Sequence, residues 1–103
     1  MDESIAFQII LYAGNARSSA MEALSFARKK DFSLAKEKIQ ESNEELLKAH
    51  KFQTELIQSE ARGELEGNIT VLLIHAQDHL MNAMTVKELA EEIIFLHEEL
   101  LNK

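Results

Sequence analysis

Apolar residues recur at steps of three and four along three stretches of the chain, which is the spacing of one face of an α-helix. These stretches predict helices over about residues 4–30, 32–62 and 69–101. The chain has no proline and only three glycines, so few positions can interrupt the helices. At about 1.5 Å per residue each helix is about 40–50 Å long. Short connections between them predict an all-α, antiparallel three-helix bundle.

Two short segments separate the predicted helices. In "KKDFS", Lys29 and Lys30 suit the negative end of a helix dipole, and the carboxylate of Asp31 is expected to cap the second helix. In "RGELEGNIT", two glycines bracket an acidic loop over residues 63–67, and Asn68 is expected to cap the third helix. Neither segment has the glycine spacing of a phosphate-binding loop.

The middle of the first predicted helix is built from small residues. Gly14 stands there among alanines and serines, although glycine costs about 1 kcal/mol in a helix interior relative to alanine. A close approach by another helix would be one reason to carry it. We therefore expect a neighbouring helix to contact the first one near Gly14.

The third predicted helix carries more apolar surface than a single three-helix bundle can bury. Residues 71–74 and 93–96 are hydrophobic on nearly all sides of the helix. Such a face promotes aggregation unless another molecule covers it. The pattern predicts self-association, in which a small symmetric oligomer buries the second face.

Composition narrows the class of protein. The 103 residues fit one domain over residues 1–103, and a formal charge of −7 argues against nucleic acid as a partner, because phosphate backbones are bound by basic patches. There is no cysteine, which removes disulfides, thiolate metal sites and cysteine nucleophiles. The acidic amino terminus is unlike a signal peptide, and no apolar stretch approaches the roughly 20 residues of a membrane span. We therefore expect an intracellular protein without membrane insertion.

Three chemically active side chains follow the apolar start of the third predicted helix, in "VLLIHAQDHLMNAM". His75, Asp78 and His79 are three and four residues apart, so they can share one flank. A metal-binding regulatory bundle would use all three as ligands. Alternatively, His79 is a core histidine with Asp78 as its hydrogen-bond partner, without further function. In a third interpretation an imidazole attacks phosphorus and holds a labile phosphoryl group. The spacing alone leaves these alternatives open.

The histidines differ in their expected exposure. His79 falls on the apolar stripe of the third helix and is expected to be more buried, whereas His75 lies beside that stripe near the start of the helix. A phosphoryl carrier must be accessible to two partner proteins, which favours His75. His50 and His97 have no acidic neighbour three residues away and are expected to have no catalytic role.

The stretch "IHAQDHLMNAMTVKELAEEII" closely resembles the active-site signature of the IIA component of the lactose/cellobiose-type (lactose/N,N'-diacetylchitobiose) sugar phosphotransferase system. The alanine-rich first helix, the "DF" pair before the second helix and the glycine loop also resemble this family, so the resemblance covers essentially the whole chain. It implies a cytoplasmic three-helix protein that assembles as a homotrimer, with nine helices around a threefold axis.

The resemblance also implies a role for each motif residue. His75 corresponds to the phosphoryl acceptor, and Gln77 and His79 correspond to supporting residues. Asp78 corresponds to an aspartate near the trimer axis. Three like carboxylates there would raise each other's pKa, and a divalent cation such as Mg²⁺ would offset their repulsion.

By the same resemblance, the protein is a phosphotransferase component. It would accept a phosphoryl group from the phosphohistidine of HPr and pass it to the cysteine of a cognate IIB protein, while the membrane IIC component imports a β-linked disaccharide. The resemblance leaves the sugar open among cellobiose, chitobiose, lactose and others. A metal-binding regulatory bundle and a purely structural oligomerisation module are the competing classes.

Overall fold

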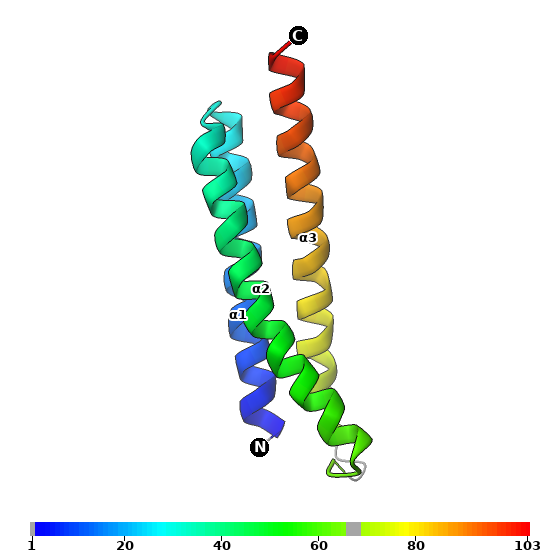
Figure 1. Ribbon diagram of the computed structural model, residues 1–103. Helices are drawn as coiled ribbons and strands as arrows, with labels where there is room; N and C mark the ends of the chain where they lie inside the picture. The colour runs from blue at the N-terminus through cyan, green and yellow to red at the C-terminus, as the bar shows by residue number, and fades with distance from the viewer. Residues whose placement is uncertain (1, 66–68) are drawn as a thin grey trace.

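A computed structural model describes residues 2–65 and 69–103. Helix α1 spans Asp2–Arg28, α2 spans Phe32–Ala61 and α3 spans Val71–Leu101. The described part of the chain contains these three helices and no strand. Consecutive helices run in opposite directions and form a rod with extents of 57 × 19 × 18 Å (Figure 1). The predicted antiparallel three-helix bundle is confirmed for the single chain.

The turn between α1 and α2 follows the predicted chemistry. The Asp31 carboxylate accepts a hydrogen bond from the backbone N–H of Leu34 at 3.2 Å and caps α2, as expected. Lys30 has a φ of 68°, in the left-handed region that ends a helix. For this reason α1 ends at Arg28 rather than at residue 30.

Helix α3 begins later than its sequence pattern predicts. The Thr70 hydroxyl accepts a hydrogen bond from the backbone N–H of Leu73 at 3.2 Å, so the helix starts at Val71 rather than at residue 69. The expected cap, Asn68, lies outside the described residues. Thr70 therefore fixes the start of α3 at Val71, the first residue of the apolar run.

The core is built around α1, whose alanine-rich face is buried against both other helices. One cluster of buried side chains surrounds Ile9 and Leu80, and a second surrounds Ile39 and Ile94 nearer the carboxyl end of α3. Alanine side chains are short, so the backbones of neighbouring helices can approach α1 closely. The apolar spacing of residues 4–30 predicts one buried stripe, and all of its residues are buried or half-buried: Ile5, Ile9, Tyr12, Ala13, Ala16, Ala20, Ala23, Leu24 and Ala27.

The buried face of α2 is narrower than its apolar pattern predicts. The apolar spacing of residues 32–62 predicts that Leu47 and Ile57 lie on that face, but both are exposed in the single chain. Two serines are buried instead, and the hydroxyl of Ser42 donates a hydrogen bond to the carbonyl oxygen of Ala16 at 2.7 Å. A serine fits between α2 and the alanine face because it is small and its polar group finds a partner.

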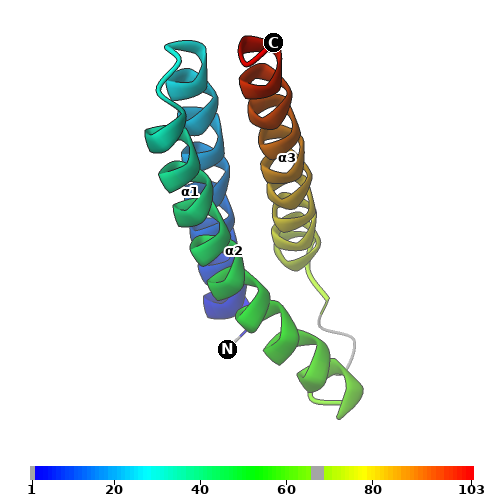
Figure 2. The ribbon, with the colours of Figure 1, turned by 45° about the horizontal axis from the view of Figure 1, so that its top comes forward.

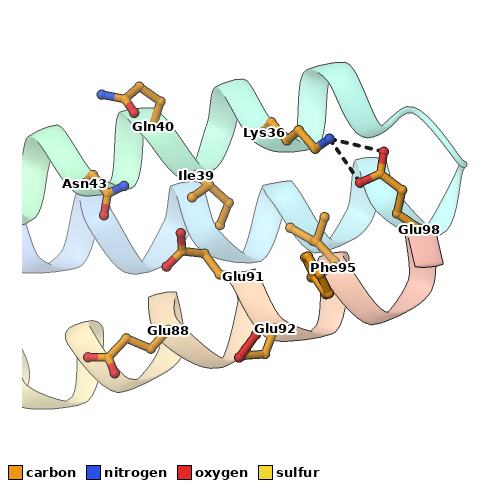
Figure 3. A pocket seen from close by; sticks show the side chains of 10 residues that line it. Lys36, Ile39, Gln40, Asn43, Glu88, Glu91, Glu92, Phe95 and Glu98 are labelled. Carbon is orange, nitrogen blue, oxygen red and sulfur yellow. Dashed lines mark hydrogen bonds and ion pairs between the residues drawn. The ribbon is translucent and has the colours of Figure 1, made fainter.

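Helix α3 stands apart from α2 toward the carboxyl end of α3, whereas α1 and α2 lie side by side in that half of the bundle (Figures 1 and 2). A groove of about 690 Å³ opens between α2 and α3 there, with Ile39 and Phe95 among its apolar lining (Figure 3). Lys36 and Glu98 form an ion pair of 3.0 Å across one end of it. The facing surfaces of α2 and α3 are therefore only partly in contact with each other.

The predicted surplus of apolar surface on α3 is present. Large hydrophobic side chains of this helix remain more than half exposed, at Val71, Ile74, Met81, Leu89, Ile93, Phe95, Leu96 and Leu100. Among residues 2–65 and 69–103, no helix is long and apolar enough to cross a bilayer. Within the single chain this apolar face of α3 remains exposed.

Candidate functional site

The candidate site lies on the first turns of α3, where each side chain direction follows from its position on the helix. Successive residues of an α-helix are rotated by about 100°. His75 and His79 therefore share one flank, Asp78 lies on the neighbouring outer face, and Gln77 points to the side of α3 that faces α2. The contacts of His75, Gln77 and His79 agree with these directions.

The imidazole rings of His75 and His79 are stacked. Their centroids are 5.9 Å apart and their planes differ by 18°. His75 is exposed and His79 is half-buried, as the sequence predicts. The half-buried ring provides a flat support for the exposed one, whose nitrogens are accessible from solution.

His79 also contacts the narrow part of α1. A β-carbon added to Gly14 would stand 3.5 Å from the Nε2 atom of His79, which is ordinary van der Waals contact. A neighbouring helix therefore contacts α1 at Gly14, as expected, but it does so through the His79 side chain at ordinary distance and not through a close backbone approach.

Asp78 is exposed on the face of α3 that points away from the core. The core residues Ala76 and Leu80 lie on the other side of the helix. Among the described residues, no hydrogen bond joins the Asp78 carboxylate to His79. The interpretation that makes Asp78 the hydrogen-bond partner of a core His79 is therefore wrong for the single chain.

Gln77 is held by a residue that sequence analysis does not identify. The side-chain N–H of Gln53 on α2 donates a hydrogen bond to Oε1 of Gln77 at 2.6 Å, and both residues are half-buried. Gln53 belongs to no motif, and its contact depends on the register between α2 and α3. The pair places Gln77 on the side of α3 opposite His75.

A metal centre within one chain receives no support. In the part of the chain that the structure describes, no three His, Cys, Asp or Glu side chains lie together in a group that could hold an ion. Asp78 turns outward from the flank that carries His75 and His79.

The two remaining histidines have ordinary environments. His97 packs edge-on against Phe32, with ring centroids 5.4 Å apart and an interplanar angle of 86°. His50 is exposed. His50 lies on α2 and His97 near the carboxyl end of α3, and the absence of a catalytic role for them stays a prediction.

The matching family model decides among the classes of function. It is the model of the lactose/cellobiose-specific IIA subunit of the PTS system, and it matches residues 4–98. The chain belongs to this IIA family. It is therefore a IIA component of a sugar phosphotransferase system, a class of protein that relays phosphoryl groups.

Relatives of this IIA component are named for several sugars. The chain is 59% identical over 98 residues to the lichenan-specific phosphotransferase enzyme IIA component of Bacillus subtilis, covering 95% of this chain and 88% of that one. It is 43% identical over 98 residues to the N,N'-diacetylchitobiose-specific EIIA component of Escherichia coli strain K12, covering 95% and 84%.

Solved structures of IIA proteins share the fold. The cellobiose-specific enzyme IIA from Bacillus anthracis superimposes with a TM-score of 0.95 at 59% identity, covering 100% of this chain and 94% of that one. The chitobiose IIA of Escherichia coli, solved as a complex with HPr, gives a TM-score of 0.84 at 41% identity and covers 97% and 96%. The three-helix bundle of this chain is thus the IIA fold over its whole length.

Proposed function

We propose that this chain carries a phosphoryl group on His75, taking it from the phosphohistidine of HPr and passing it to the cysteine of a cognate IIB protein. The observation that carries the proposal is the exposed ring of His75, stacked on half-buried His79. A carrier meets two proteins in turn, so its ring must be reachable from solution. The similarity to a IIA protein solved with HPr supports HPr as the donor.

The transfer consists of two displacements at phosphorus. An unprotonated ring nitrogen of His75 attacks, a new N–P bond forms, and the N–P bond to the HPr histidine breaks with its electron pair returning to that imidazole. In the second step a IIB thiolate attacks phosphorus and an S–P bond forms. The N–P bond to His75 breaks, and its electron pair returns to the imidazole. Such reactions depend on positioning and charge stabilisation, and the stacked ring of His79 supplies positioning.

We propose that three copies assemble around α3. Its exposed apolar residues Val71, Ile74, Met81 and Leu96 lie within about 80° of the helix circumference, and Asp78 lies in the middle of this face. Turning the face to a common axis removes it from water. The resemblance of the chain to a trimeric family favours threefold symmetry over twofold.

The same arrangement accounts for a divalent cation. Each chain would bring one exposed carboxylate, Asp78, to the axis, and three carboxylates provide the oxygen ligands that Mg²⁺ prefers. An ion bound there would offset the repulsion among the three charges. Such an ion would be held between chains, because each chain would contribute one carboxylate.

Gln77 can support His75 only if the two residues belong to neighbouring copies of the chain. Side chains two residues apart on a helix point about 200° apart, so Gln77 and His75 of one chain face nearly opposite directions. In a closed ring of copies, one flank of each subunit meets the other flank of the next. We therefore assign Gln77 to the His75 of a neighbouring copy.

The names of similar proteins suggest which sugar the transport system carries. The two similar proteins at 59% identity are named for lichenan and cellobiose, which both contain β-linked glucose. A β-linked disaccharide is therefore the proposed cargo of the transport system. The chain would act in the cytoplasm, where HPr and the IIB protein meet it.

Incubation with phospho-HPr tests the proposed function. The chain should gain one phosphoryl group per copy, and acid should remove it while alkali preserves it, as for a phosphoramidate. A structural oligomerisation module would gain none. A metal-binding regulator would also gain none, and would instead bind zinc at one ion per chain.

A further inference from the structure

Two rows of residues with a spacing of seven line the interface between α1 and α3. Each row has a half-buried apolar residue at both ends and a polar residue in the middle: Ile10, Arg17 and Leu24 on α1, and Leu72, His79 and Val86 on α3. Residues seven apart on a helix point within about 20° of each other, so each row stays on one flank of its helix.

The two rows lie in register. The apolar residue at the start of each row packs against the core cluster that contains Leu80, and the one at the end packs against the cluster that contains Ile94. Helices α1 and α3 run in the same direction, because each is antiparallel to α2 (Figure 1). The middle residues, Arg17 and His79, therefore stand at the same level of the bundle.

The side chain of Arg17 leads toward the turn that carries the imidazole rings. Side chains on a helix lean toward its amino terminus. The ring of His79 does so, since its Nε2 atom reaches the level of Gly14, about one turn before Arg17 on α1. Arg17 leans the same way on a parallel helix, and an arginine side chain spans more than one helical turn of about 5.4 Å. The guanidinium is thus carried toward the His79 ring, on which His75 is stacked.

Arg17 also supplies positive charge where the two helices have no other. It is the only Lys or Arg among residues 1–27, and residues 71–86 contain none. The next basic residue on α3, Lys87, is paired with Glu91 at 3.0 Å. Within the part of the chain that the structure describes, no carboxylate forms an ion pair with Arg17, whose side chain is exposed. This cation is therefore available to another anion.

We propose that Arg17 is a catalytic residue that binds the oxygens of the phosphoryl group on His75. This inference rests on the proposed function, because it needs a phosphorylated His75. A phosphoryl group carries about −1.5 to −2 charges near neutral pH, and a guanidinium matches two of its oxygens with parallel N–H donors. Arg17 forms no covalent bond in this role. It stabilises the charge on the phosphoryl oxygens while phosphorus passes between two nitrogen atoms.

Two other roles would also place an unpaired arginine beside the rings. In the first, Arg17 attracts the HPr protein without touching the phosphoryl group. In the second, it pairs with a carboxylate of a neighbouring copy. A small donor, phosphoramidate, separates the first role from the proposed one, because it needs no docking surface. When His75 attacks its phosphorus, the N–P bond of the donor breaks and the electron pair leaves on ammonia.

Four variants make the test. Arg17→Gln and Arg17→Met remove the charge, and methionine keeps an apolar stem at the α1–α3 interface. Arg17→Lys keeps the charge without the parallel donors. Arg28→Gln removes an equal charge at the exposed end of α1 and is the matched control. Melting curves and sedimentation first establish the fold and the assembly of each variant, which should equal those of the unmodified chain.

The readout is the rate of phosphorylation by phospho-HPr and, separately, by phosphoramidate. Arg17→Gln and Arg17→Met should be about 100-fold slower than the unmodified chain with both donors, the effect of losing one group that stabilises developing charge. Arg17→Lys should recover part of the rate, and Arg28→Gln should match the unmodified chain. The second pKa of the phosphoryl group, followed by ³¹P NMR, should rise in the two charge-removing variants, because a nearby cation favours the ionised form.

Slowing with phospho-HPr alone would assign Arg17 to HPr docking and overturn the inference. Loss of fold or assembly in both charge-removing variants would assign it to a structural contact and also overturn the inference, as would normal rates with both donors. Failure of the unmodified chain to gain any phosphoryl group from phospho-HPr would instead contradict the proposed function.

Discussion

The Nε2 atom of His79 lies 3.5 Å from the point where a β-carbon on Gly14 would stand. This relationship joins the narrow middle of α1 to the ring that supports His75. A methyl group at position 14 would be in normal contact with His79, whereas a longer side chain would occupy the space of the ring. The space between position 14 and the candidate site therefore admits a methyl group but no larger side chain in that direction.

Substitutions of Gly14 should separate stability from activity. Gly14→Ala should raise the free energy of unfolding by about 1 kcal/mol through helix propensity, with phosphorylation by phospho-HPr retained. Gly14→Leu should displace His79 and slow phosphorylation. Chemical denaturation and a labelling time course measure the two effects. A Gly14→Leu protein that is labelled at the normal rate would show that the position of His79 does not matter for transfer.

Assembly as a homotrimer is the second prediction. The exposed apolar face of α3 should be covered by two further copies, so sedimentation equilibrium at micromolar concentration should return about three times 11.7 kDa. A monomer at that concentration would remove the basis for placing Asp78 on an axis. It would also remove the assignment of Gln77 to a neighbouring copy.

Replacement of Asp78 tests the axis more directly. If three carboxylates meet there, Asp78→Leu should stabilise the trimer by on the order of 1 kcal/mol per chain, because buried like charges are costly and apolar side chains relieve that cost. A chelator should lower the melting temperature of the unmodified protein and leave that of the variant unchanged. Equal sensitivity to the chelator in both proteins would place any bound ion elsewhere.

Much of the fold could be predicted because it depends on local chemistry. The apolar spacing gives three helices, Asp31 caps α2, and the small residue Gly14 marks a close helix contact. The positions of His75 and His79 relative to the core also follow from helical periodicity alone. These features need no knowledge of how distant parts of the chain meet.

Other features depend on packing between helices and could not be predicted. Leu47 is exposed, and Ser42 is buried where its hydroxyl donates a hydrogen bond to the carbonyl oxygen of Ala16 on α1. The Gln53–Gln77 hydrogen bond requires the register of α2 against α3. The cap of α3 is Thr70, although asparagine, which the sequence offers at residue 68, is the stronger capping residue.

The account centres on His75 as the phosphoryl carrier, and mass spectrometry of variants tests that claim most directly. His75→Gln and His79→Gln are each incubated with phospho-HPr, and the added phosphoryl groups are counted at neutral or alkaline pH. Because His75 is exposed, His75→Gln should keep the fold and the assembly but gain no phosphoryl group. His79→Gln should still gain one per chain, at a lower rate. One phosphoryl group per chain on His75→Gln would contradict the account and make His79 the acceptor.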